Sequence, residues 1–238
     1  MNRNFFIFLI TFFFIAFVLI RTFLFSVHVF NGKVGVDLTA RINIDDGTNL
    51  KIIKEKYQFV ILRAVRCIDV VRRKNQHNYK SKIDDNFITN WPDLKKIKKT
   101  KGAYHVFSPG LSGKEQFELY KQNVQLEKGD LPPILDPVSY LGININEAQI
   151  WIDLARDYYK TEPIIYICSQ PVDYWGLKLK NCKFWIYDSK EELSMSFYSS
   201  KIVIQQYKQN IITDNMKITV DLNKFLGDSN DFEKLLIK

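Results

Sequence analysis

Apolar and polar positions follow a repeating order along most of the chain. A short apolar run is followed by a stretch in which apolar residues recur every three or four positions. This order is typical of β-strands that are connected by crossover helices in a largely parallel sheet. The pattern predicts strands at 33–38, 57–65, 102–107, 134–138, 163–168, 184–187, 202–207 and 218–222.

Helical spacing predicts the connections between these strands. We expect a helix near 49–56 and another in the second half of 84–100. Ser112 and Glu115 fit a capping box that would start a third helix, and Asn146 can cap a fourth. Little helical pattern separates the last three strands. Five strand–helix units followed by three strands predict an α/β fold, namely a TIM-like (β/α)5(β)3 barrel.

The N-terminal segment is too apolar for a soluble core. Residues 5–20 read FFIFLITFFFIAFVLI, and the apolar character resumes after Arg21 and continues to Phe30. Crossing a hydrocarbon layer takes about 20 residues. We therefore expect residues 1–30 to form an N-terminal transmembrane helix, in membrane contact through 5–30, and residues 31–238 to form one barrel domain.

The flanking charge predicts the orientation of this anchor. Arg3 precedes the apolar block, which favours a cytoplasmic N-terminus. The barrel would then lie on the outer or periplasmic side of the inner (cytoplasmic) membrane, as part of a single-pass protein. A cleaved signal peptide, giving a secreted protein, is the alternative; the block is longer than an ordinary signal sequence and lacks a small-residue cleavage site.

Charge and metal-binding residue types narrow the choice of partners. The formal net charge of +8 comes from spread lysines such as Lys95 and Lys96, without an arginine stripe interleaved with aromatic residues. This favours a solvated basic face and no nucleic-acid partner. The three cysteines and three histidines lack metal-type spacing, so no metal and no cofactor is expected, and His105 is predicted to be a core residue. The oligomeric state has no signal in the sequence.

Three aspartates stand at the ends of predicted strands: Asp37, Asp136 and Asp221. The reactive groups of such barrels stand at the carboxyl ends of the strands, where the loops converge on one mouth. We therefore expect the three carboxyl groups to meet there. Each of them alone could equally be a loop residue or a helix cap.

Several motifs, in order, are similar to those of glycoside hydrolase family 25. The resemblance starts at GVDLT (35–39) and continues through GAYHVFSP (102–109), GDLPPILD (129–136), PIIYICS (163–169) and VDLNKF (220–225). The family comprises lysozymes (N-acetylmuramidases) that cut the glycan chains of peptidoglycan. The resemblance implies a lysozyme barrel that acts on peptidoglycan, with Asp37, Asp136 and Asp221 as its catalytic carboxylates.

One position departs from the family in a way that affects catalysis. The proton donor of the family is the glutamate of an Asp-x-Glu pair on the fourth strand, and here Val138 follows Asp136 at that spacing. A carboxylic acid must protonate the glycosidic oxygen as the bond breaks, which is typically worth about 10²- to 10⁴-fold in rate. Arg66 and Cys67 also depart from the family's KATEG motif, and Gln205 replaces a tryptophan. The resemblance thus predicts weakened hydrolysis.

Aromatic and amide side chains near the strand ends are candidates for sugar binding. Aromatic faces pack against the apolar side of pyranose rings. The candidates are Tyr104, Tyr166, Trp185 and Tyr207, with Gln206 as a hydrogen-bonding partner of the substrate. Ordinary core packing is the alternative for each aromatic residue.

Three functions are compatible with these features. The first is a membrane-anchored lysozyme-like domain that binds or acts on peptidoglycan in the cell envelope, with hydrolysis weakened by loss of the general acid. The second is an active peptidoglycan glycoside hydrolase in which Asp37 or Asp221 supplies the proton. The third is a pseudoenzyme that serves as a non-catalytic interaction module of the envelope.

Overall fold

The computed structural model describes residues 33–38, 44, 47–70, 78–137, 144–168, 172–189, 199–212, 216 and 218–238. Residues 33–238 belong to one compact unit. The predicted anchor at 5–30 and the position of Val138 lie outside the described residues. Within the described part, no helix is both long and apolar enough to span a membrane.

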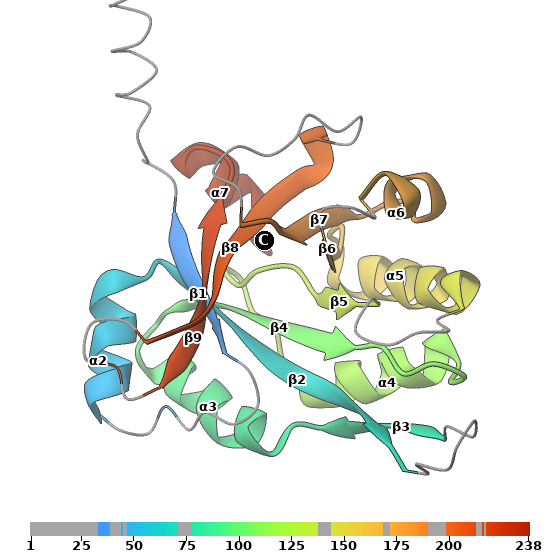
Figure 1. Cartoon of the computed structure of the whole chain (residues 1–238), viewed down its shortest axis with the longest axis horizontal. Helices are drawn as coiled ribbons and strands as arrows, with labels where there is room; N and C mark the ends of the chain where they lie inside the picture. Colours follow the sequence, from blue (N-terminus) through green and yellow to red (C-terminus); the bar gives the residue numbers. More distant parts are fainter. Residues whose placement is uncertain are drawn as a thin grey trace, which may run out of the picture. The chain divides into compact units, whose positions relative to one another are not determined.

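The centre of the fold is a closed barrel (Figure 1). Its strands are β1 (Val34–Leu38), β2 (Phe59–Asp69), β4 (Thr100–Val106), β5 (Ile134–Asp136), β6 (Ile164–Cys168), β7 (Lys183–Tyr187), β8 (Ile202–Ile212) and β9 (Thr219–Phe225). They follow the order β1-β9-β8-β7-β6-β5-β4-β2, and pairing of β1 with β2 closes the ring. All eight strands predicted from the sequence are present, which confirms the α/β barrel.

The last strand runs against the others. β9 pairs antiparallel with both β1 and β8, whereas the pairs β1–β2, β2–β4, β4–β5, β5–β6, β6–β7 and β7–β8 are all parallel. The residues at the start of β9 therefore lie at the same end of the barrel as the carboxyl ends of the other strands. This end is called the mouth below.

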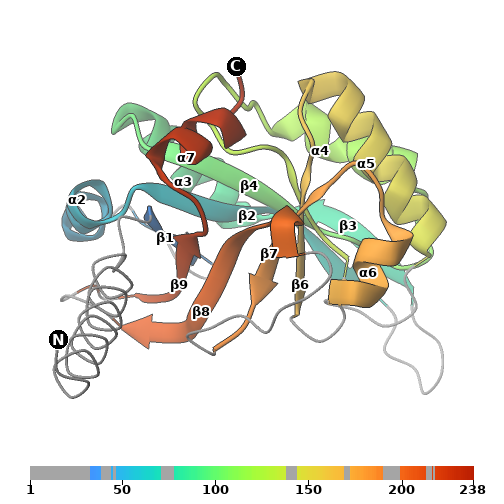
Figure 2. The same ribbon diagram turned by 90° about the horizontal axis from the view of Figure 1, so that it is seen from above.

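Helices cover the outside of the barrel (Figure 2). They are α2 (Gly47–Lys56), α3 (Asp85–Lys96), α4 (Gly113–Asn123), α5 (Ile145–Tyr159), α6 (Val172–Lys178) and α7 (Ser229–Leu235). The first five follow β1, the β2–β3 pair, β4, β5 and β6 in turn, and α7 follows the last strand. Among the described residues no α-helix separates β7, β8 and β9, as the sequence predicts.

The helix caps follow the sequence in one case and differ in another. The predicted capping box starts α4: the backbone N–H of Glu115 donates to the hydroxyl of Ser112 at 3.2 Å. The cap of α5 is Asn144, not Asn146. The Asn144 side chain accepts a hydrogen bond from the Asn146 backbone N–H at 3.0 Å, so Asn146 already belongs to the first turn.

Helix α3 is longer than expected at its amino end. The sequence predicts helix only in the second half of 84–100, with a start or kink near Pro92. Asp84 caps the helix by accepting from the backbone N–H of Asn86 at 3.1 Å, and the helix begins at Asp85 and contains Pro92. Because this cap satisfies free N–H groups of the first turn, the polar residues at the start can be helical.

Two hydrophobic layers result from the alternation of side chains along the strands. The outer layer packs between the strands and the helices and includes Trp151 and Ile152 of α5. The inner layer fills the barrel and includes Phe59, Tyr104, Trp185 and Phe225. Helix α7 closes this interior at the end opposite the mouth, where Phe232 lies 5.7 Å from Phe59 and 5.2 Å from Phe225 between ring centroids. The barrel is therefore a packed core, and only its mouth is available for chemistry.

One strand of the described residues has no counterpart among the predictions. Strand β3 (Tyr79–Ile83) pairs antiparallel with the outer part of β2 and forms a two-stranded arm at the mouth. The sequence predicts that β2 ends at Val65, but the strand continues to Asp69. The hydroxyls of Ser81 and Ser108 are 2.8 Å apart, which ties the arm to the exit of β4. Because the exposed face of the arm carries charged residues, the sequence has no apolar run there that would predict a strand.

Candidate active site

The barrel brings the three predicted aspartates to its mouth. Asp37 stands near the carboxyl end of β1, and Asp136 is the last residue of β5. Asp221 was expected at the carboxyl end of the last strand but is the third residue of β9. It reaches the mouth because β9 is antiparallel, and the β1–β9 register places Asp221 directly opposite Asp37.

Two side-chain amides hold the carboxyl group of Asp37. Its Oδ1 atom accepts hydrogen bonds from Gln206 Nε2 at 2.8 Å and from Asn223 Nδ2 at 2.7 Å. Gln206 Nε2 also lies 3.4 Å from Asp221 Oδ2 and so links the two acids. The Asn223 oxygen in turn accepts from Trp185 Nε1 at 2.8 Å. Four strands therefore contribute to a single network.

The network continues from Gln206 toward the next strands. The Gln206 oxygen accepts from the hydroxyl of Tyr166 and from Gln209 Nε2, both at 2.8 Å. With both ends of its amide engaged, the Gln206 side chain has one defined orientation. The sequence predicts a substrate-binding role for Gln206, and in the structure this amide positions Asp37. Only 2% of Gln206 is exposed.

The environment of Asp37 favours its protonated form. Only 3% of the residue is exposed. Burial, followed by the negative charge of Asp221, raises the pKa of Asp37 to about 8 against the opposing effect of the two amide hydrogen bonds. Burial also raises the pKa of Asp221, although a hydrogen bond from the Asn210 backbone N–H at 2.7 Å opposes it. Two close carboxyl groups of this kind share one proton near neutral pH.

Tyr104 belongs to the inner layer and is affected by the charges of all three acids. Burial raises the pKa of its phenol, and the charges of Asp37, Asp136 and Asp221 raise it further, whereas the positive charge of Arg63 lowers it. The Tyr104 ring packs edge-on against Trp185 with centroids 6.2 Å apart. The charges of all three aspartates therefore act on the same phenol in the barrel interior.

The other predicted sugar platforms occupy different positions. Tyr166 is half-buried beside Trp185, with ring centroids 4.5 Å apart. Trp185 is only 2% exposed, so its faces pack in the core. Its indole N–H donates a hydrogen bond to Asn223. Tyr207 lies on the helix side: burial and then Tyr57, a residue of the outer layer, raise its pKa. Among the aromatic candidates, the structure gathers Tyr104, Tyr166 and Trp185.

Two residues of the site were not predicted. Asn223 stands two positions after Asp221, and Arg63 stands two positions after Ile61 of the inner layer. Side chains alternate between the two faces of a strand, so both of these point into the barrel. Their spacing in the sequence could therefore have identified them as candidate site residues. His105 faces the outer layer, as expected for a core residue. It is fully buried beside the Tyr120 ring, and burial lowers its pKa to about 3.

A metal centre has no support in the described part of the chain. No group of three or more His, Cys, Asp or Glu residues is arranged there to hold a metal ion. The site consists of carboxyl, amide and phenol groups and the guanidinium group of Arg63, which suit proton transfer and hydrogen bonding to a polar ligand.

Comparison with solved structures identifies the fold. A family 25 glycosyl hydrolase from Bacillus anthracis superimposes with a TM-score of 0.66 at 23% identity, over 85% of this chain and 92% of that one. A lysozyme from Streptomyces coelicolor gives a TM-score of 0.62 at 19% identity, over 87% and 97% of the two chains. The autolysin LytC from Streptococcus pneumoniae, solved with a synthetic peptidoglycan ligand, gives 0.61 at 15% identity, over 82% and 47%.

These likenesses confirm the resemblance found in the sequence at the level of the fold: the chain has the fold of the family 25 lysozymes. No family model matches the sequence. The uncharacterized protein YegX of Escherichia coli K12 is 31% identical over 88 residues, which cover 35% of this chain and 32% of YegX. The chain therefore spans about a third of the length of this curated relative.

The raised pKa of Asp37 has a consequence for stability. An aspartate in the unfolded chain has a pKa of about 3.9, so the folded protein binds an extra proton between there and about 8. The contribution of this group is complete below the unfolded pKa and is lost as pH rises through the folded one. We expect Asp37→Asn to reduce the fall in the free energy of unfolding between pH 4 and 8.

Urea unfolding at closely spaced pH values measures this slope. Asp157→Asn on the exposed face of α5 is the matched control and should keep the wild-type slope. An unchanged slope in Asp37→Asn would contradict the burial of a protonated carboxyl group at this site.

Proposed function

We propose that this chain is a membrane-anchored, lysozyme-like domain that binds and slowly hydrolyses the glycan chains of peptidoglycan in the cell envelope. The observation that carries the proposal is the position of Asp37, Asp136 and Asp221 at the same mouth of a barrel with the lysozyme fold, with Asp37 directly opposite Asp221. Proteins of this fold include a lysozyme and an autolysin solved with a peptidoglycan ligand, which supports a glycan as partner.

The identity of residue 138 supports slow hydrolysis. By resemblance, Asp136 positions the N-acetyl group of the substrate, which can act as an internal nucleophile, and the next residue but one donates the proton. Strand β5 ends at Asp136, and the chain continues through Pro137 to Val138. Valine has no proton to donate, so the departing sugar lacks assistance worth about 3–5 kcal/mol of barrier.

The apolar segment at 5–30 supports the proposed location. A single-pass anchor would hold the barrel on the outer or periplasmic side of the cytoplasmic membrane, where peptidoglycan lies. Alkaline carbonate extraction of cell membranes tests this: an anchored chain stays in the membrane pellet, and a cleaved, secreted chain appears in the soluble fraction with a mass that lacks the N-terminal segment.

The proposal predicts binding without efficient cleavage. A soluble form spanning 31–238 should bind purified peptidoglycan in a pull-down assay and release few reducing muramic ends, measured by mass spectrometry. Val138→Glu should increase release, by up to about 10²- to 10⁴-fold if the new carboxyl group reaches the glycosidic oxygen. Val138→Gln, of similar size but without an acid, is the matched control.

The outcomes separate the parts of the proposal. Rapid release of muramic ends by the wild-type domain would refute weakened hydrolysis but not the glycan substrate. Absence of binding to peptidoglycan would refute the substrate and favour an interaction module.

A second candidate is an active hydrolase that uses Asp37 as its acid. The observation in its favour is the buried carboxyl group of Asp37, whose pKa of about 8 keeps it protonated at neutral pH. Asp37 and Asp221 face each other, so one could protonate the leaving group while the other stays ionised. This arrangement would supply the proton that Val138 cannot.

This candidate makes a distinct prediction about pH. Turnover should fall as pH rises through about 8, because ionised Asp37 has no proton to donate. Asp37→Asn should abolish release of muramic ends, and Asp221→Asn, which removes the charge that helps to raise the pKa of Asp37, should move the decline to lower pH. Turnover by Asp37→Asn at the wild-type rate would eliminate Asp37 as the acid.

A further inference from the structure

Arg63 places a positive charge inside the mouth. It follows Phe59 and Ile61 on the inward face of β2, and the β2–β4 register pairs it with Tyr104. Its charge lowers the pKa of the Tyr104 phenol, whereas Asp37, Asp136 and Asp221 raise it. Among the described residues whose charge shifts the Tyr104 pKa, Arg63 is the one cation.

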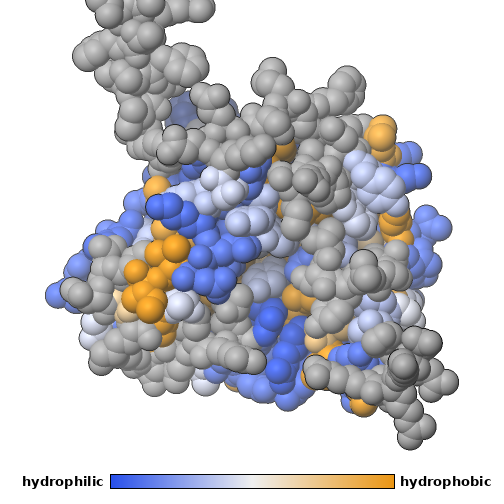
Figure 3. Space-filling view, viewed as in Figure 1, coloured by the Kyte–Doolittle hydropathy of each residue, from blue (hydrophilic) through white to orange (hydrophobic). Residues whose placement is uncertain are grey.

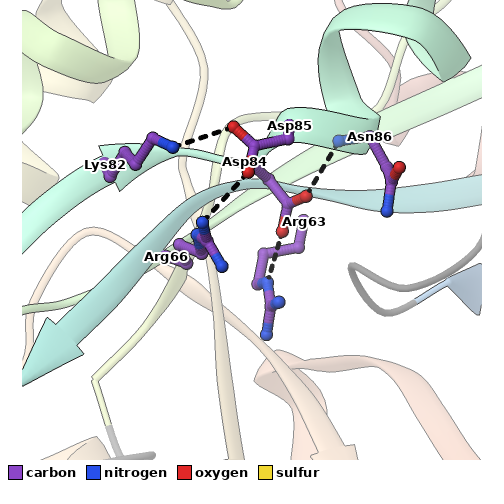
Figure 4. Close-up of polar contacts among 6 residues, drawn as sticks. All are labelled: Arg63, Arg66, Lys82, Asp84, Asp85 and Asn86. Carbon is purple, nitrogen blue, oxygen red and sulfur yellow. Dashed lines mark hydrogen bonds and ion pairs between the residues drawn. The ribbon is translucent and has the colours of Figure 1, made fainter.

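Asp84 fixes the guanidinium group of Arg63 from one side (Figure 4). Arg63 Nε donates to Asp84 Oδ2 at 2.9 Å. Asp84 is itself only 2% exposed and is held by the cap hydrogen bond from Asn86 and by its own N–H, which donates to the Ala64 carbonyl at 2.8 Å. The anchor of the arginine is therefore rigid.

The rest of the guanidinium group is available to a ligand. The Arg63 side chain is 24% exposed, and its two terminal nitrogens make no hydrogen bond to any residue in the described part of the chain. An arginine carries five N–H donors in a planar fork, and the Asp84 contact uses one of them. The remaining donors have the geometry that suits a carboxylate.

Arg66 lies three positions after Arg63 on β2 and has a different environment. It donates to Asp85 at 3.0 Å, and Lys82 contacts the same carboxylate at 2.9 Å (Figure 4). The Arg66 and Asp85 side chains are 33% and 65% exposed. Unlike the terminal nitrogens of Arg63, Arg66 Nη2 is therefore already engaged by an exposed carboxylate. Arg66 is thus a surface ion-pair residue of the same chemical type.

We propose that Arg63 binds a carboxylate of the muramyl unit and so gives the mouth a specificity for muramyl sugars. The inference rests on the proposed function, that is, on a glycan in the mouth. N-acetylglucosamine carries no carboxylate, whereas the muramyl sugar carries a lactyl group, either free as a carboxylate or extended by a peptide stem that has carboxylates of its own. The acids of the mouth that stay ionised repel an anion, so the Arg63 fork defines the position that can accept one.

Affinity for three probes tests the proposal. The full chain in detergent micelles is titrated by calorimetry with peptide-free glycan strands, with strands that keep their peptide stems, and with chitooligosaccharides of matched length, which have no carboxylate. We expect a carboxylate-bearing probe to bind about 10-fold more tightly than the chitooligosaccharide, as for a partly exposed charge-assisted contact. Preference for the peptide-free strands assigns the lactyl carboxylate; preference for the substituted strands alone assigns the stem.

Matched variants connect this preference to the side chain. Arg63→Gln should reduce the affinity ratio to about one, and Arg66→Gln, with the same change of charge on the same strand, should keep it. Arg63→Lys keeps the cation beside Asp84 but loses the fork, so it should retain an intermediate ratio. Circular dichroism of each variant verifies folding, and Arg63→Lys serves as the folded test if Arg63→Gln unfolds because Asp84 is left unpaired.

Two results would overturn the inference. Equal affinity of the wild-type chain for all three probes would show that no carboxylate is recognised, while leaving the glycan-binding function intact. A wild-type preference that Arg63→Gln and Arg63→Lys both retain would show that another group recognises the carboxylate. Failure of the wild-type chain to bind any of the probes would instead reject the proposed function, and the inference with it.

Discussion

The antiparallel insertion of β9 between β1 and β8 determines the site. This pairing sets Asp221 opposite Asp37, and it brings Asn223 and Gln206 into register with each other. A parallel last strand would carry the same residues in the reverse direction relative to the mouth. The electrostatics follow from this geometry, because two carboxyl groups on facing strands inside a barrel repel each other and lose hydration together.

The hydrogen bonds of the amide network offset part of the free-energy cost of burying these acids. Gln206 and Asn223 both donate to a single oxygen of Asp37. The oxygens of these two amides accept hydrogen bonds in turn, from Tyr166 to Gln206 and from Trp185 to Asn223. A buried polar network of this kind is stable only when its members are satisfied, and it then has one arrangement. The mouth is thus preorganised by residues that need not touch a ligand themselves, which is a common division of labour at reactive sites.

The strands of the barrel could be predicted from the sequence because each of them has a recognisable local hydrophobic pattern. Each strand is a short apolar run flanked by polar residues, and these runs are recognisable without knowledge of their partners. The arm formed by β2 and β3 was missed because its exposed face is charged, and the short helix α7 was missed because seven residues carry little periodicity. Both elements depend on tertiary contacts for their stability.

The site was predicted in part, for a related reason. The three aspartates stand out because they follow apolar runs, and strand alternation could have indicated Asn223 and Arg63. By contrast, the contact between Arg63 and Asp84 joins residues 21 positions apart through a helix cap, and no spacing rule anticipates it. Trp185 looked like a sugar platform because residue type does not distinguish an exposed ring from a buried one.

The closing of the barrel floor by α7 has a consequence for the synthesis of the protein. Strand β1 emerges first among the strands, yet one of its two partners is β9, and Phe59 is covered by Phe232 of α7. The backbone N–H of Ile237 donates to the Asp130 carbonyl at 2.9 Å beyond that helix. The aromatic interior can therefore close only after β9 and α7 have been synthesised, and a shorter nascent chain exposes apolar side chains that favour aggregation.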